Sequence, residues 1–178
     1  GPLLPHLTNS ERRDPALAAV ISRHVLVWTG AACVMVFVLA DVLVRLLYSS
    51  EFFPSVAPLR WILPGILALS VGRVLVAEIL ARKKIMYTLW VSMVTAVLNI
   101  VGNIILIPSM GIAGSALASS FSYTVASALV IWCYIRETGV PWSTLLPRVS
   151  DLQVYLSLSR RAVDLGLGWI STIRKAQP

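Results

Sequence analysis

Four apolar runs, each long enough to cross a lipid bilayer, dominate this sequence. They cover residues 25–47, 59–80, 85–107 and 111–135. The hydrocarbon core of a bilayer is spanned by about 20 residues of helix, and backbone in lipid must satisfy its own hydrogen bonds. Because the runs are continuous rather than alternating, they exclude a closed β-barrel. We therefore expect an all-α fold, a polytopic bundle of four transmembrane helices.

Composition agrees with a membrane protein. Hydrophobic residues make up 57% of the chain and charged residues 13%, whereas soluble domains carry about 25% charged residues. The net charge of +7 does not indicate a nucleic-acid partner, because the basic residues flank the apolar runs as membrane topology requires. Cys33 and Cys133 lie inside apolar runs and predict packing rather than metal binding.

The runs divide the chain into three parts. Residues 1–24 are expected to be a cytoplasmic segment without a signal peptide, whose helix starts at Asp14-Pro15 and follows the membrane interface to His24. Residues 25–136 form the transmembrane region. Residues 137–178 form a basic cytoplasmic tail, read either as an amphipathic interfacial helix or as a poorly ordered end.

The basic residues also predict an orientation. Twelve Lys and Arg residues lie in the 1–24 segment, the 81–84 loop and the tail, and none lies in the 48–58 or 108–110 loop. By the positive-inside rule both termini face the cytoplasm of a multi-pass protein in the cell inner membrane.

Prolines and glycines predict where the helices end. Pro54 and Pro58 should separate the first two spans. Pro64 favours a kink early in the second span. Pro108 should end the third span, and Gly111 should open the fourth.

The third span carries a polar stripe without formal charge. Its members, spaced by steps of 4, 3, 4 and 4, are Thr88, Ser92, Thr95, Asn99 and Asn103. These steps place all five on one helical face, which must avoid lipid because an unsatisfied amide in hydrocarbon costs several kcal/mol. The face either lines a substrate pathway or bonds to a neighbouring helix, at about 0.6 kcal/mol per contact. Both readings stay open for the amides, whereas the hydroxyls favour bonds to their own helix.

Arg73 lies deeper in its span than any other charged residue. It is roughly two helical turns, or about 10 Å, from the end of the span next to the 81–84 loop. A charge inside a membrane span is a functional-site candidate by default. The candidate pathway residues are therefore Arg73, Asn99, Asn103, Thr95 and Ser92.

Three other charges within the spans predict structural roles. Asp41 is followed one helical turn later by Arg45, and this i,i+4 spacing predicts an ion pair. Glu78 lies near the membrane boundary and has Arg82 or Lys83 as its expected partner.

The fourth span opens with two ladders of small residues, which permit close approach of helix backbones. We expect mainly helix packing from Gly111, Gly114, Ser115, Ala118, Ser119 and Ser122.

Catalytic chemistry is not indicated by the sequence. His6 and His24 both lie in the amino-terminal segment, and no nucleophile–base pair, metal-ligand cluster or phosphate-binding glycine loop is evident. We expect that the protein is not an enzyme and that it has no cofactor and no metal site.

Several motifs together resemble a known family. They are Leu63-Pro-Gly-Ile, Arg73-Val-Leu, Ala81-Arg-Lys-Lys, the hairpin at 98–123, and Tyr134-Ile-Arg-Glu-Thr-Gly. With these motifs, residues 5–150 resemble the C-terminal part of bacterial polysaccharide (Wzx-type) flippases. Those proteins belong to the MOP exporter superfamily, together with MATE transporters and the lipid II flippase.

The resemblance implies a function. Such flippases move undecaprenyl-diphosphate-linked oligosaccharides across the bacterial inner membrane by alternating access, using two six-helix lobes. The four spans would be the last four of a MATE-like C-terminal lobe, so the chain is expected to be a fragment that lacks the N-terminal lobe. Its implied partners are membrane lipid, lipid-linked oligosaccharide and that missing lobe.

By this comparison, Arg73 suits a diphosphate and the amides suit sugar hydroxyls. The alternatives are an exporter of lipid II or drugs from the same superfamily, and a structural or assembly membrane subunit without transport activity.

Overall fold

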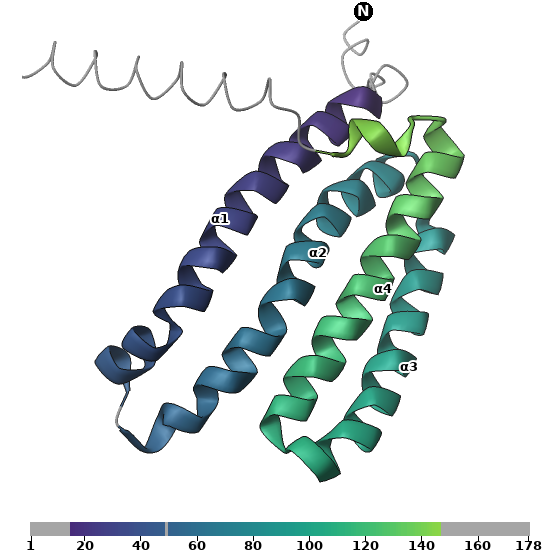
Figure 1. Cartoon of the computed structure of the whole chain (residues 1–178). Helices are drawn as coiled ribbons and strands as arrows, with labels where there is room; N and C mark the ends of the chain where they lie inside the picture. Colours follow the sequence, from purple (N-terminus) through teal and green to yellow (C-terminus); the bar gives the residue numbers. More distant parts are fainter. Residues whose placement is uncertain (1–14, 49, 147–178) are drawn as a thin grey trace, which may run out of the picture. The chain divides into compact units, whose positions relative to one another are not determined.

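The computed structural model describes residues 15–48 and 50–146, and its long elements are all α-helices (Figure 1). The elements are α1 (Pro15–Leu47), η2 (Ser50–Ser55), α2 (Val56–Ala81), α3 (Ile85–Met110), α4 (Ile112–Thr138) and η3 (Trp142–Thr144). Within the described residues, four helices are long and apolar enough to cross a membrane. The predicted all-α bundle with four spans is therefore confirmed.

Helix α1 is described from Pro15 onward, so its predicted start at Asp14-Pro15 lies at the limit of the described residues and stays a prediction. It continues without a break past His24, so the stretch expected to follow the interface belongs to the same 33-residue helix. The predicted segment before residue 15 and the predicted interfacial helix of the tail beyond residue 146 lie outside the described residues.

The prolines end fewer helices than the sequence suggests. Pro58 lies in the first turn of α2, where its missing N–H removes no helical hydrogen bond. Pro64 lies inside the same helix. Pro108 also lies inside a helix, because α3 continues to Met110. The predicted end of the third span at Pro108 is thus wrong by two residues.

Gly111 makes the turn between α3 and α4. Its backbone has φ +58° and ψ −136°, a conformation that residues with a Cβ rarely adopt. A Cβ built on Gly111 would meet nothing within 4 Å. The predicted packing role of this residue is therefore wrong, and its function is to permit the turn.

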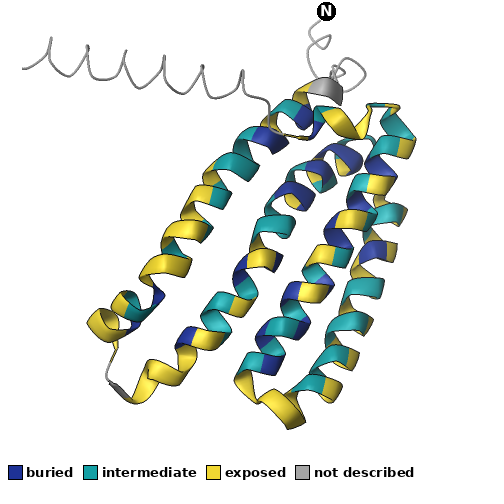
Figure 2. Ribbon diagram, viewed as in Figure 1, coloured by how far each residue is buried: buried dark blue, intermediate teal, exposed yellow. Residues whose placement is uncertain are grey.

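Helices α2 and α4 form the centre of the bundle. The two run parallel, α1 packs against α2, and α3 packs against α4 (Figure 1). Buried residues concentrate on α2 and α4, while α1 and α3 are mostly half-buried or exposed (Figure 2). This arrangement leaves α2 and α3 with few direct contacts.

A seam of small residues joins α2 to α4. A Cβ on Gly65 would lie 2.4 Å from Ser120 Cα, and a Cβ on Gly72 would lie 2.9 Å from Ser127 Oγ. Each helix thus contributes two small residues spaced by seven, a period that keeps one face turned toward a parallel partner. The Gly65 N–H also donates a hydrogen bond to Ser120 Oγ at 2.9 Å. The seam allows backbone contact that larger side chains would prevent.

A second close approach joins α3 to α4. A Cβ on Gly114 would lie 2.3 Å from the Leu106 carbonyl oxygen, and a Cβ on Gly102 would lie 3.0 Å from Ala118 Cβ. Gly114 and Ala118, two of the residues expected to pack, lie in this contact. Ser115 is half-buried nearby.

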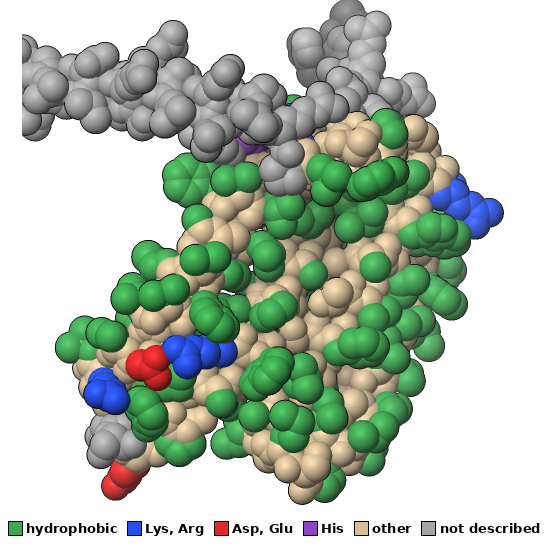
Figure 3. Space-filling view, in the orientation of Figure 1, with side chains coloured by type: hydrophobic (Ala, Val, Ile, Leu, Met, Phe, Trp, Pro, Cys, Tyr) green, Lys and Arg blue, Asp and Glu red, His purple; other side chains and the backbone are tan. Residues whose placement is uncertain are grey.

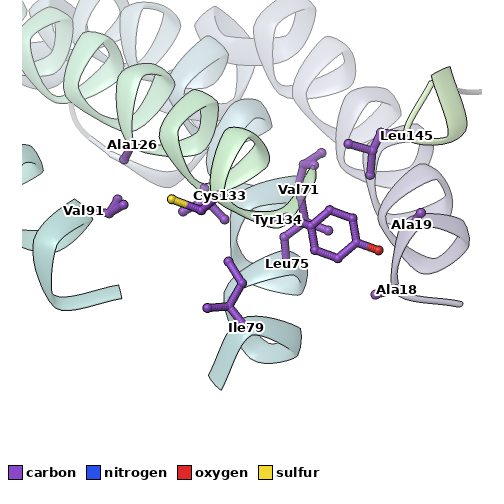
Figure 4. Packing of buried hydrophobic residues seen from close by; sticks show 11 residues of the cluster. Ala18, Ala19, Val71, Leu75, Ile79, Val91, Ala126, Cys133, Tyr134 and Leu145 are labelled. Atoms are coloured by element: carbon purple, nitrogen blue, oxygen red, sulfur yellow. The ribbon is translucent and has the colours of Figure 1, made fainter. Parts of the chain in front are cut away.

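The apolar core lies at the end of the bundle where α1 begins and α4 ends. Tyr134 is fully buried there, beside Leu75 of α2 and Ala19 of α1 (Figure 4). Cys133 belongs to the same cluster. Apolar side chains also cover much of the outer surface (Figure 3), as expected where helices face lipid or neighbouring helices.

Candidate functional site

A cavity of about 570 Å³ lies between α2 and α3, with α4 contributing the third wall. It forms because both helices pack on α4 and touch each other little. Its size falls in the range of roughly 300–1,000 Å³ typical of small-molecule sites. The polar side chains in its lining are Arg73, Thr88, Ser92, Thr95, Asn99, Tyr123 and Ser127.

The polar stripe of α3 supplies one wall. Thr88, Ser92, Thr95 and Asn99 all line the cavity, as their spacing along one helical face requires. Thr95 donates its hydroxyl to the carbonyl of Val91 at 2.7 Å, the local bond expected of a hydroxyl in a membrane helix. The Thr88 hydroxyl is buried without a hydrogen-bond partner among the described residues.

Arg73 supplies the positive charge. It is the only formally charged side chain among the described residues that line the cavity. Its side chain is exposed, and within residues 15–48 and 50–146 no hydrogen bond or salt bridge occupies its guanidinium. A guanidinium offers five N–H donors in a planar fork. The cavity therefore combines a cationic fork with hydroxyl and amide groups.

The amides of α3 bond to α4 and to each other. Asn99 Nδ2 donates to Ser119 Oγ at 3.1 Å and to Ser122 Oγ at 3.2 Å. Asn103 Nδ2 donates to Asn99 Oδ1 at 3.0 Å. Asn99 thus bonds α3 to α4, as one of the two readings predicts, and it also lines the cavity. The substrate-pathway reading stays a prediction.

Asn103 lies outside the cavity, although it is bonded to Asn99. It does not line the cavity, although the stripe placed it on the same face. Its Oδ1 is buried without a hydrogen-bond partner among the described residues. The structure brings together Arg73, Ser92, Thr95 and Asn99 in the cavity lining, and it leaves Asn103 out of that lining.

Two residues of α4 were missed by the sequence reasoning. Tyr123 and Ser127 line the cavity, and the Ser127 hydroxyl is buried with no partner among the described residues. Their i,i+4 spacing places them on one helical face, so the sequence could have grouped them. The neighbouring Ala and Ser residues instead favoured an interpretation of this helix as a packing surface.

The other charges in the spans form ion pairs or stack on rings. Asp41 Oδ2 lies 2.6 Å from Arg60 Nη2, so the predicted pairing of Asp41 with Arg45 is wrong. Arg45 instead stacks over the Phe53 ring at 5.1 Å. Glu78 pairs with Arg82 at 3.0 Å, one of its two expected partners. The Asp41 pair joins α1 to α2, an arrangement that local spacing cannot reveal.

The helices and the cavity define a class of protein. The chain has four spanning helices, three of them line a cavity that contains one cation, and no group of three potential metal-ligating side chains occurs in the described part of the chain. Four helices of this kind are the feature of a multi-pass membrane protein.

Comparison with family models identifies the family. The model described as "Lipid II flippase MurJ" matches residues 3–162. The chain therefore belongs to the MurJ lipid II flippase family. This match supports a flippase of the MOP superfamily, but it does not specifically support the polysaccharide branch that the motifs suggested. No curated protein and no solved structure matches the chain.

Proposed function

We propose that the protein works as a membrane transporter, not as an enzyme, and that it moves lipid II across the inner membrane. The four helices would form one side of a lobe in an alternating-access machine. The observation that carries this proposal is the cavity, where Arg73 lies among hydroxyl and amide groups. The family match favours lipid II over the undecaprenyl-linked oligosaccharide that the motifs alone suggest.

The cavity chemistry suits a lipid-linked sugar diphosphate. A guanidinium binds phosphate oxygens through two parallel charge-assisted hydrogen bonds. The exposed Ser92 hydroxyl can donate to and accept from a sugar hydroxyl, and Asn99 Oδ1, which accepts one hydrogen bond from Asn103, has a second lone pair to offer. A volume of about 570 Å³ accommodates the diphosphate and an adjoining sugar, so the rest of the headgroup would contact the other lobe.

The proposed orientation follows the basic residues. The end of the bundle that carries Arg82, Lys83 and Lys84 would face the cytoplasm, by the positive-inside rule. Arg73 would then lie in the cytoplasmic half of α2. This position suits capture of a precursor that is made on the cytoplasmic side.

A structural or assembly role is the second candidate. Two features that serve packing support it. They are the glycine–serine seam between α2 and α4 and the hydrogen bonds that the Asn99 side chain of α3 donates to α4. The two candidates differ in what they require of Arg73. Helix packing does not use its guanidinium, whereas substrate movement does.

The test is transport by the intact protein with Arg73→Ala and Arg73→Lys. Purified protein in vesicles is given lipid II with a labelled headgroup, and transfer between leaflets is measured. Loss of charge-assisted hydrogen bonds, worth about 1.5–3 kcal/mol, should reduce transfer by at least about tenfold in Arg73→Ala. Arg73→Lys keeps the positive charge but loses the planar guanidinium, so its transfer rate should lie between those of Arg73→Ala and the unmodified protein.

Arg45→Ala is the matched control, because Arg45 stacks on Phe53 outside the cavity. It should leave transfer close to the unmodified rate. Full transfer by Arg73→Ala at equal protein level would refute the pathway role and favour the structural candidate.

A further inference from the structure

A second cavity lies between α3 and α4 at the basic end of the bundle. Its volume is about 630 Å³, and it shares no residue with the Arg73 cavity. Its lining includes Lys83 and Lys84, which precede α3. It also includes Met86 and Trp90 of α3 and Trp132 of α4. The cavity thus combines cations with large apolar side chains.

Positive charge predominates at this cavity. The Lys84 ammonium lies 3.2 Å from Glu137 Oε2, so one cation is balanced. Lys83 has no ion pair with any described residue. Arg136 stacks over the Trp132 ring at 5.3 Å. The Arg82 guanidinium forms a salt bridge with Glu78. Of the two lysines that line the cavity, Lys83 therefore remains unbalanced.

The apolar part of the lining is open to the surroundings. Met86, Trp90 and Trp132 are each more than half exposed. Tryptophan gathers where the apolar core of a membrane meets the headgroups. Lysines at a helix end next to such residues lie at the depth of lipid phosphates.

We propose that this cavity binds an anionic phospholipid of the surrounding membrane. The phosphate would lie at Lys83 and Lys84, and one acyl chain would follow Met86, Trp90 and Trp132. Charge complementarity selects an anionic over a zwitterionic lipid, and an acyl chain matches the exposed apolar side chains. The site would be separate from the substrate cavity, and it does not depend on the proposed transport.

The test uses quenching of tryptophan fluorescence by lipids with brominated acyl chains. The intact protein is placed in phosphatidylcholine vesicles without any lipid-linked sugar. Brominated phosphatidylglycerol or brominated phosphatidylcholine is then added at equal fractions. The phosphatidylglycerol should quench at a lower fraction, and raised salt should narrow the difference.

The variants locate the site. Lys83→Asn with Lys84→Gln should reduce the preference for phosphatidylglycerol by about fivefold or more, the contribution of one unbalanced lysine at a membrane surface. Asn suits position 83 because its backbone has φ +61°. Trp90→Phe with Trp132→Phe should remove the selective part of the quenching.

Arg45→Gln is the control, because it removes a cation that does not line this cavity. It should keep the full preference. Equal quenching by both lipids in the unmodified protein, or a preference that survives the double lysine variant, would overturn the proposal.

Discussion

Gly65→Ala tests whether the seam between α2 and α4 holds the bundle together. The added Cβ would lie 2.4 Å from Ser120 Cα and 2.9 Å from the Ser120 carbonyl oxygen. Carbon atoms in contact lie about 3.5–4.0 Å apart, so the two backbones must separate by about 1 Å. This movement also lengthens the hydrogen bond from the Gly65 N–H to Ser120 Oγ.

Three terms give the size of the effect. Overpacking in a close contact costs about 1–3 kcal/mol, and loss of the hydrogen bond costs about 1 kcal/mol. Replacing glycine by alanine within a helix gains about 1 kcal/mol. The net loss of stability is about 1–3 kcal/mol, which corresponds to a fall in melting temperature of about 3–9 °C for a chain of this size.

The assay is thermal unfolding of the purified protein in detergent, followed by circular dichroism. Gly30→Ala is the matched control, because its Cβ would lie 3.7 Å from Leu67 Cδ1, an ordinary contact. The control should melt at or above the temperature of the unmodified protein. If Gly65→Ala melts together with the control, α2 and α4 do not approach as closely as described, and the reasoning fails.

Two further predictions concern the contact and the turn between α3 and α4. Asn99→Leu removes the hydrogen bonds to Ser119 and Ser122 and the acceptor of Asn103. At about 0.6 kcal/mol each, stability in detergent unfolding should fall by about 2 kcal/mol, and no change would contradict the role of this cluster. Gly111→Ala should cost about 1–3 kcal/mol in the same measurement, because φ is +58°, and an unchanged melting temperature would show that the turn has another conformation.

The helices of this fold could be predicted because lipid imposes simple requirements. Continuous apolar runs of about 20 residues specify helices, and the four predicted runs correspond to α1, α2, α3 and α4. Boundaries were harder to place. Pro108 ended the predicted span, yet α3 includes it, since one lost hydrogen bond near a helix end is tolerated and Gly111 ends the helix instead.

Residues on a single helix were easier to group than residues on different helices. The α3 stripe followed from spacing alone, and Ser92, Thr95 and Asn99 do share a cavity. The pairing of Asp41 with Arg60 did not follow, because the two lie on α1 and α2 and only the packing of these helices brings them together. The parallel seam of α2 and α4 was missed for the same reason.

The central position of α4 has a consequence for biogenesis. Gly65 and Gly72 face Ser120 and Ser127, so a nascent chain inserts α2 well before its partner exists. Until α4 enters the membrane, this glycine face is exposed to lipid or to the insertion machinery. Association of α2 with its partner must therefore wait for α4, and a ribosome that stalls before residue 112 would release a substrate for membrane quality control.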